Sequence, residues 1–174
     1  MSELARRYAQ ALFELSPDEE ALRAAAGALT GDAALWECLR SPAIQPREKE
    51  KVLDRLDLWE GRRALRGFFG LLAQKGRMNL LPDILNAFHD LALAGRGAAR
   101  CRLCCARPLD PAQLEKLRLA LCRLHHKRDV EFEVRVDPAL LGGFTLEIEG
   151  VRYDKSVRGA LAGLTRQLEE RRMA

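Results

Sequence analysis

The first 95 residues place hydrophobic side chains at helical spacing almost throughout. Apolar positions recur every three or four residues, and the runs are separated by Ser-Pro, Gly-Asp and Gln-Pro breaks. Ser2 is a candidate cap for the first helix, which runs to about Leu15, and Pro17 is expected in the first turn of the second. The pattern predicts six helices, which begin near Ser2, Pro17, Asp32, Pro46, Leu58 and Pro82.

Beyond Gly95-Arg96-Gly97 the spacing changes from helical to alternating. Residues 130–136 alternate apolar and charged side chains, and residues 144–149 repeat the pattern, which is typical of half-buried strands. Residues 99–106 also indicate a strand. A helix is expected to open at Asp110-Pro111, and a last helix is predicted from Ser156 to Arg172.

These patterns together predict a mainly α protein with a small α/β part. We expect a six-helix bundle over residues 1–96 and a β-α-β-β-α domain over residues 97–174. The glycine-bearing stretch between them is the predicted domain boundary, because glycine readily permits a change of chain direction.

The first and fifth predicted helices carry more apolar surface than a helix at the edge of a small bundle needs. On a wheel of about 100° per residue, the apolar side chains of residues 4–15 cover roughly 200°. A surface helix usually presents a stripe of about 100°. The fifth helix is similarly broad, and three glycines within it suggest close packing, since each costs about 1 kcal/mol against alanine. Two interpretations fit: a groove that receives an amphipathic partner helix, or two helices covered on all sides by their own bundle.

Composition excludes some classes of protein and leaves one alternative open. Of 174 residues, 48% are hydrophobic and 31% are charged. No apolar run approaches the roughly 20 residues that span a bilayer, and the N-terminus lacks the apolar core of a secretory signal. The net charge of +4 falls on residues 98–174, because residues 1–97 hold 14 basic and 14 acidic side chains. A small basic RNA-binding protein is therefore an alternative, although the basic residues are interspersed with acids and lack aromatic neighbours.

Five cysteines raise a second alternative, a zinc-binding regulatory protein. Cys101-x2-Cys104 and Cys122-x2-His125 mimic the spacing of zinc ligands. However, Cys101 and Cys104 fall in a predicted strand, where an odd separation sends side chains to opposite faces. The ligands would converge only if that strand were broken. Free thiols in a reducing compartment are the favoured interpretation.

The segment from Asp137 to Gly159 is the most finely specified part of the chain. Gly142-Gly143 permits positive φ or a close approach of another segment, because glycine has no Cβ. Asp154 and Ser156 are expected to cap the last helix. The chain contains no nucleophile elbow, phosphate loop or evident carboxylate pair, so neither catalysis, a metal nor a cofactor is expected. The residues of this segment therefore predict a structural role and not a catalytic one.

Several short motifs follow one another in a family-specific order over nearly the whole chain. They are Arg7-Tyr8-Ala9 with Ala11-Leu12-Phe13; Ser41-Pro42-Ala43-Ile44 with Lys49; Leu71-Leu72, Lys75-Gly76-Arg77, Leu80-Leu81-Pro82 and Phe88; Ala106-Arg107-Pro108-Leu109; and Asp137-Pro138, Leu140-Leu141-Gly142-Gly143 and Asp154-x-Ser156-Val157-Arg158. Through these motifs the chain resembles the delta subunit of bacterial F-type ATP synthases, the family of the mitochondrial oligomycin-sensitivity-conferring protein.

The resemblance implies a non-catalytic subunit of the peripheral stalk, or stator, which stops the catalytic head from turning with the rotor. It implies that the N-terminal bundle binds the N-terminal segment of an alpha subunit in a groove of the first and fifth helices. It also implies that the C-terminal domain contacts the C-terminal region of the membrane-anchored b subunit. The candidate groove residues are Tyr8, Ala11, Leu12, Leu65, Phe69 and Leu72, and the candidate structural or coupling residues are Gly142, Gly143, Asp154, Ser156 and Arg158.

The resemblance further implies one copy per complex, at the cytoplasmic face of a bacterial plasma membrane, with membrane association only through the complex. No nucleic acid is expected as a partner. Two features depart from the family pattern: the connection between the first and second helices is short, and the CRLCC strand is rich in cysteine.

Overall fold

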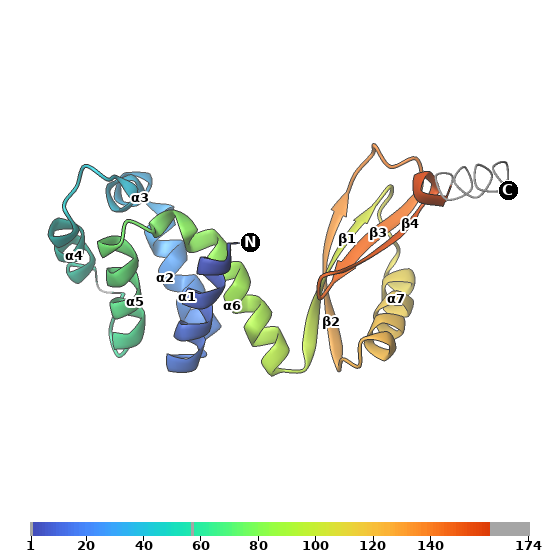
Figure 1. Cartoon of the computed structure of the whole chain (residues 1–174), viewed down its shortest axis with the longest axis horizontal. Coiled ribbons are helices and arrows are strands. Elements are labelled where there is room, and N and C mark those ends of the chain that lie inside the picture. The colour runs from blue at the N-terminus through green and yellow to red at the C-terminus, as the bar shows by residue number, and fades with distance from the viewer. Residues whose placement is uncertain (1, 57, 161–174) are drawn as a thin grey trace, which may run out of the picture. The chain divides into compact units, whose positions relative to one another are not determined.

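The computed structural model describes residues 2–56 and 58–160. The chain divides into two compact units, Met1–Ala92 and Leu93–Ala174. The first unit is helical, and the described part of the second contains a sheet that packs against helix α7 (Figure 1). The described chain is therefore mainly helical with a small mixed sheet. The division falls a few residues before the predicted boundary at 96/97.

The first unit consists of α-helices joined by short connections. The helices are α1 (Glu3–Leu15), α2 (Glu19–Gly31), α3 (Ala33–Arg40), α4 (Pro46–Asp54), α5 (Arg63–Gln74), the short 3-10 helix η1 (Met78–Leu80) and α6 (Leu81–Gly95). The prediction of six helices left out η1, which is too short to produce a periodic hydrophobic pattern.

Several helix starts differ from the prediction for local reasons. Asp18 caps α2 by accepting a hydrogen bond from the Ala21 N–H at 2.9 Å, so Pro17 precedes the cap instead of lying in the first turn. Ser2 occupies the cap position of α1, but its side chain makes no capping bond. The fifth helix begins at Arg63 rather than near residue 58, and Gly61 before it has a φ of +70°. A left-handed residue cannot continue a right-handed helix, so the chain turns there.

The core of the first unit gathers apolar side chains from all of its helices. Phe69 from α5 and Phe88 from α6 are its largest fully buried side chains. Fully buried leucines from the other elements surround them: Leu12, Leu22, Leu29, Leu39, Leu53, Leu65, Leu72 and Leu81. Tertiary packing of these faces, rather than intrinsic helix propensity, stabilises helices of this length.

The described residues of the second unit form a four-stranded mixed sheet in the order β2-β1-β3-β4, together with α7. Its elements are β1 (Ala98–Cys105), α7 (Pro111–Leu124), β2 (Asp129–Val136), β3 (Gly143–Ile148) and β4 (Val151–Ser156). β1 and β2 are parallel, whereas β1–β3 and β3–β4 are antiparallel. The parallel pair requires the crossover that α7 supplies.

One face of the sheet packs against α7 (Figure 1). Alternate residues of β1, including Cys101 and Leu103, are buried there with Leu146 and Ile148 of β3. α7 begins with a reciprocal capping box: Asp110 accepts from the Gln113 N–H at 2.6 Å, and Gln113 accepts from the Asp110 N–H at 3.2 Å.

The predicted β-α-β-β-α order was wrong in one respect, because it missed β4. The strand contributes only Val151 and Tyr153 as apolar alternating positions, too few to stand out from Arg152, Asp154 and Lys155. It forms because Glu149 (φ 50°) and Gly150 (φ 81°) allow a tight hairpin turn that brings it against β3. The predicted last helix begins with a helical turn at residues 157–160, and the rest of its range lies outside the described residues.

Candidate functional site

The predicted groove residues come from α1 and α5, two helices that pack directly against each other. Leu12 and Leu65 are 1% exposed, and Phe69 and Leu72 are 0% exposed. These four side chains therefore lie in the core of the unit. Of the six predicted groove residues, Tyr8 is half-buried and Ala11 is exposed.

Two further leucines of α1 and α5 are exposed, although the sequence-based selection of groove residues did not include them. Leu15 at the end of α1 is 75% exposed, and Leu71 of α5 is 42% exposed. Tyr8, Ala11 and Leu15 are spaced by three and four residues, so they follow one side of α1. That spacing was the available signal. We call Tyr8, Ala11, Leu15 and Leu71 the α1–α5 surface.

Tyr8 is held in place by contacts with α5 and the residues that follow it. Its ring meets Phe68 edge-on, with 6.3 Å between centroids. The Arg77 guanidinium donates a hydrogen bond to the Tyr8 hydroxyl at 2.7 Å, and its carbon lies 5.8 Å from the ring centroid. An aromatic ring that is oriented before binding loses little conformational entropy when a partner covers it.

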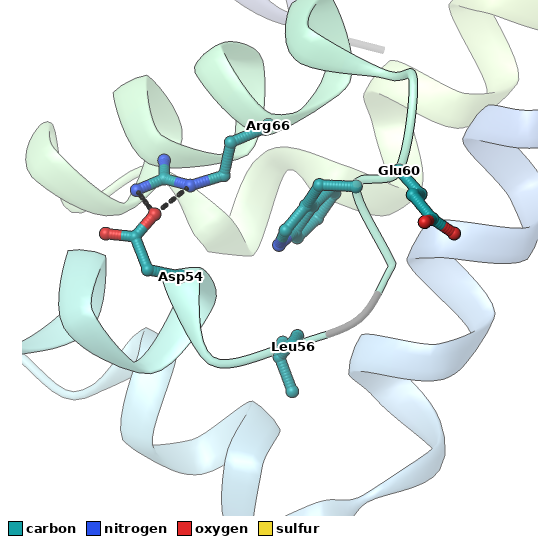
Figure 2. Close-up of a pocket in the computed structure, with 5 residues that line it drawn as sticks. Asp54, Leu56, Glu60 and Arg66 are labelled. Atoms are coloured by element: carbon teal, nitrogen blue, oxygen red, sulfur yellow. Dashed lines mark hydrogen bonds and ion pairs between the residues drawn. The ribbon is translucent and has the colours of Figure 1, made fainter.

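A hollow of about 420 Å³ lies where the chain passes from α4 to α5. Figure 2 shows Arg66 of α5 paired with Asp54 of α4, while Leu56 and Glu60 border the same hollow. Arg66 Nη2 lies 2.6 Å from Asp54 Oδ1, and the Trp59 indole donates to the Leu53 carbonyl at 2.6 Å. The Arg66–Asp54 pair anchors the start of α5 against α4, and the Trp59 bond fixes the connection before α5, so both help to position the α5 side of the α1–α5 surface.

The predicted glycine pair lies where β3 begins beside the end of β4. Gly143 has a φ of +79°, and a Cβ on it would lie 2.2 Å from the Lys155 carbonyl oxygen. The Gly142 carbonyl accepts the Val157 N–H at 3.0 Å, and the Gly143 carbonyl accepts the Ala106 N–H at 3.2 Å. The glycine pair therefore joins the ends of β1, β3 and β4, and both conditions that favour glycine, positive φ and close approach, are met at Gly143.

Asp154 and Ser156 form the cap that was expected before residues 157–160. Asp154 Oδ1 accepts the Ser156 N–H at 2.9 Å, and Ser156 Oγ accepts the Gly159 N–H at 3.0 Å. Hydrogen bonds from the Ser156 hydroxyl and backbone lower the pKa of the Asp154 carboxyl below its ordinary value. Arg158 is exposed immediately after this cap.

The geometry of the second unit bears on the two alternative functions, zinc binding and RNA binding. Cys101 is buried on the α7 side of β1, whereas Cys104 borders a hollow on the other face, so the strand separates the two thiols. Within the described residues, no group of three or more His, Cys, Asp or Glu side chains is placed to hold a metal ion. Arg102 lies between Glu133 and Glu147, so the charge of this basic residue is partly balanced by acids of the same sheet.

Comparison with known proteins gives a consistent result. Residues 4–168 match the family model described as ATP synthase delta (OSCP) subunit. The chain belongs to the ATP synthase delta (OSCP) subunit family. It is 33% identical over 178 residues to the ATP synthase subunit delta of Myxococcus xanthus, with 97% of each chain covered. It is 35% identical over 175 residues to that of Rhodospirillum centenum, with 94% of this chain and 92% of the relative covered.

A solved structure shares the fold of this family member. A chain of the Toxoplasma gondii mitochondrial ATP synthase hexamer superposes with a TM-score of 0.69 at 20% identity, covering 96% of this chain and 98% of the other. In the described part of the family member, no helix combines the length and apolar character needed to cross a bilayer.

Proposed function

We propose that this chain is a non-catalytic subunit of the peripheral stalk of an F-type ATP synthase. It links the catalytic head to the membrane-anchored b subunits, so that ion-driven rotation is coupled to ATP synthesis. The observation that carries the proposal is the match to the delta (OSCP) family over residues 4–168. The division into two compact units supports it, because a linker between two assemblies needs two binding surfaces.

The first unit binds the N-terminal segment of an alpha subunit through the α1–α5 surface. Leu15 and Leu71 are exposed apolar side chains, and covering a leucine fully contributes about 1.5–3 kcal/mol. An amphipathic helix presents apolar side chains at the same three- and four-residue spacing, so it is the partner that this surface suits. In this proposal Tyr8 and Ala11 contact the partner, while Leu12, Leu65, Phe69 and Leu72 support the surface from the core.

The second unit contacts the C-terminal region of the b subunit and transmits load between the partners. The glycine pair and the Asp154–Ser156 cap couple three strands to the residues after β4, which resists shear within the unit. The subunit is present in one copy per complex. It is held at the cytoplasmic face of a bacterial plasma membrane through its protein partners, with no nucleic acid involved.

The substitution Tyr8→Asp tests the first interface. A carboxylate at this half-buried position must be desolvated when a helix covers it, which costs several kcal/mol. We expect binding to a peptide of the alpha N-terminus to be lost in calorimetric titration, with the helical circular dichroism retained. Gln10→Asp is the matched control, because it makes the same change from a neutral side chain to a carboxylate on an exposed residue of the same helix outside the α1–α5 surface.

If Tyr8→Asp binds the alpha peptide as tightly as the control variant does, α1 is not part of the interface.

A substitution in the second unit tests the coupling of rotation to ATP synthesis. A Cβ at Gly142 would lie 3.0 Å from Val157 Cγ2, and the two further methyl groups of Gly142→Val add to this crowding at the start of the residues after β4. We expect membranes that contain Gly142→Val to lose ion-driven ATP synthesis or the variant to unfold in its second unit. Retention of both synthesis and fold would contradict the structural role of the glycine pair.

A further inference from the structure

The sheet face that points away from α7 carries an ordered row of charges. Glu133, Arg102, Glu147 and Arg152 are direct neighbours across β2, β1, β3 and β4 in turn. Side chains directly opposite each other in a sheet point to the same face. The row therefore alternates acid and base across all four strands. We call this side of the sheet the open face.

The next row of side chains along the strands rises less far above the sheet, because its two central side chains are small. Arg135, Cys104, Thr145 and Asp154 are its neighbours from β2 to β4. A hollow of about 410 Å³ lies over Cys104 and Thr145, and its charged lining consists of Arg102, Arg135 and Arg152 together with Glu133 and Glu147. The hollow has a floor of short side chains and a border of long, charged ones.

The charges around this hollow are unequally matched. Arg102 forms ion pairs with both acids of the row: its Nε lies 3.5 Å from a carboxylate oxygen of Glu133, and its Nη1 lies 3.7 Å from one of Glu147. All three side chains are about half exposed, at 46%, 55% and 49%. Among the described residues, Arg135 and Arg152 make no side-chain hydrogen bond or close ion pair, although the Asp154 carboxylate on the same face attracts Arg152. The N–H donors of both guanidinium groups, on the two edge strands beside the hollow, therefore remain unused.

We propose that the open face binds an acidic segment of the stalk partner, with a carboxylate side chain entering the hollow between Arg135 and Arg152. The chemistry favours this occupant, since a guanidinium fork matches a carboxylate with two parallel hydrogen bonds. The alternating row, whose four residues also line the hollow, orients the segment, because like charges placed opposite each other are unfavourable. This inference rests on the proposed function, and it specifies which surface of the second unit meets the stalk and which side chains the stalk presents.

Cys104 provides a direct readout, because its thiol lies in the hollow. In a Cys38→Ala/Cys122→Ala chain, Cys101 and Cys105 are buried and Cys104 is the accessible thiol. Alkylation of Cys104 by N-ethylmaleimide is followed by mass spectrometry in the isolated chain and in the assembled synthase. We expect alkylation at least about tenfold slower in the synthase, because the centre of a protein interface excludes solvent.

Charge reversal tests the recognition itself. Arg135→Glu and Arg152→Glu each remove a charged hydrogen bond and should weaken binding of the stalk subunit about tenfold. Lys155→Glu is the matched control, because Lys155 lies on β4 three residues after Arg152 and on the opposite face. We expect the control to bind the stalk normally and binding of the unmodified chain to weaken as salt rises.

The outcomes separate this inference from the function on which it rests. If the chain purifies with the head and stalk but Cys104 reacts equally fast in the synthase and in isolation, the open face is not the interface and only the inference fails. Cys104 that is already protected in the isolated chain also overturns it. If inorganic phosphate slows the alkylation of Cys104 in the isolated chain as much as assembly into the synthase does, the hollow is a site for small anions and the inference is wrong. A chain that purifies with no synthase subunit overturns the proposed function and the inference together.

Discussion

Arg77 donates a hydrogen bond to the hydroxyl of Tyr8 at 2.7 Å, and the two residues are separated by 69 positions in the sequence. The bond ties the middle of α1 to the connection between α5 and η1. The same guanidinium lies 5.8 Å from the centroid of the Tyr8 ring. One basic side chain therefore orients Tyr8, the aromatic residue of the α1–α5 surface.

Tyr8→Phe should destabilise the first unit by about 0.5–1.5 kcal/mol, the net value of one hydrogen bond. The edge-on contact with Phe68 remains in this variant, so the loss isolates the hydroxyl. Urea denaturation of the variant, of Arg77→Ala and of the double variant completes a double-mutant cycle. Strictly additive effects would show that the bond contributes nothing to stability.

Leu12→Ala and Leu15→Ala separate the core from the surface within one helix. Leu12 is 1% exposed and Leu15 is 75% exposed. Leu12→Ala should cost about 2–5 kcal/mol of unfolding free energy, because it leaves a cavity. Leu15→Ala should change stability by less than about 0.5 kcal/mol but weaken binding of the alpha peptide. Thermal denaturation and calorimetric titration measure the two effects, and an unchanged peptide affinity for Leu15→Ala would remove Leu15 from the interface.

Gly143→Ala and Gly150→Ala compare close approach with backbone strain alone. Both residues have positive φ, at +79° and +81°, but only a Cβ at Gly143 meets another segment, the Lys155 carbonyl oxygen at 2.2 Å. Gly150→Ala should cost about 1–3 kcal/mol from strain. Gly143→Ala should cost clearly more and lower the unfolding midpoint of the second unit further. Similar midpoints for the two variants would mean that β3 and β4 can separate slightly without loss.

Asp154 should make the second unit sensitive to acid. Its pKa is lowered in the folded chain, so its stabilising contribution is complete above the ordinary value of 3.8 and is lost as the pH falls through the lowered value. Asp154→Asn should therefore be less stable than the unmodified chain near neutrality, and the difference should shrink in acid. Chemical denaturation at several pH values measures this, and a difference independent of pH would exclude the carboxylate as its source.

Cys101 should make stability fall in alkali. Burial raises the pKa of the Cys101 thiol from 9.0 to about 11. The unfolded chain therefore releases this proton first, and the stability that the neutral thiol contributes is lost as the pH rises from about 9 towards 11. Cys101→Ala should lower stability near neutrality by creating a small cavity and should reduce the alkaline decline. Equal declines in both chains, measured by denaturation on either side of this range, would contradict the prediction.

The glycine pair shows how far a local pattern can be interpreted without a structure. Two adjacent glycines before an alternating strand indicated positive φ or a close approach, and Gly143 has both. The Asp154–Ser156 cap was also predictable, because capping depends on residues that are close in sequence. In contrast, β4 was missed because a strand with two apolar positions forms only when its partner β3 is already present.

The α1–α5 surface illustrates the other limit. The helical wheel of α1 showed an apolar arc wider than a surface helix usually presents, which left open a partner groove or coverage on all sides by the bundle. It did not separate Leu12 from Leu15, since both belong to the arc. Which part of the arc is covered depends on the positions of α5 and α6, and these are set by packing between residues far apart in sequence.

The amino-acid sequence alone determined the main helical periods, the alternation of β2 and β3, the Asp154–Ser156 cap, the glycine pair and the family resemblance. Each depends on neighbours within a few residues or on motif order. Only the tertiary structure decided which apolar residues are exposed, that β4 completes the sheet, and that Arg135, Cys104 and Arg152 border one hollow. Burial and cross-strand register are properties of segments brought together by the fold, so no local pattern contains them.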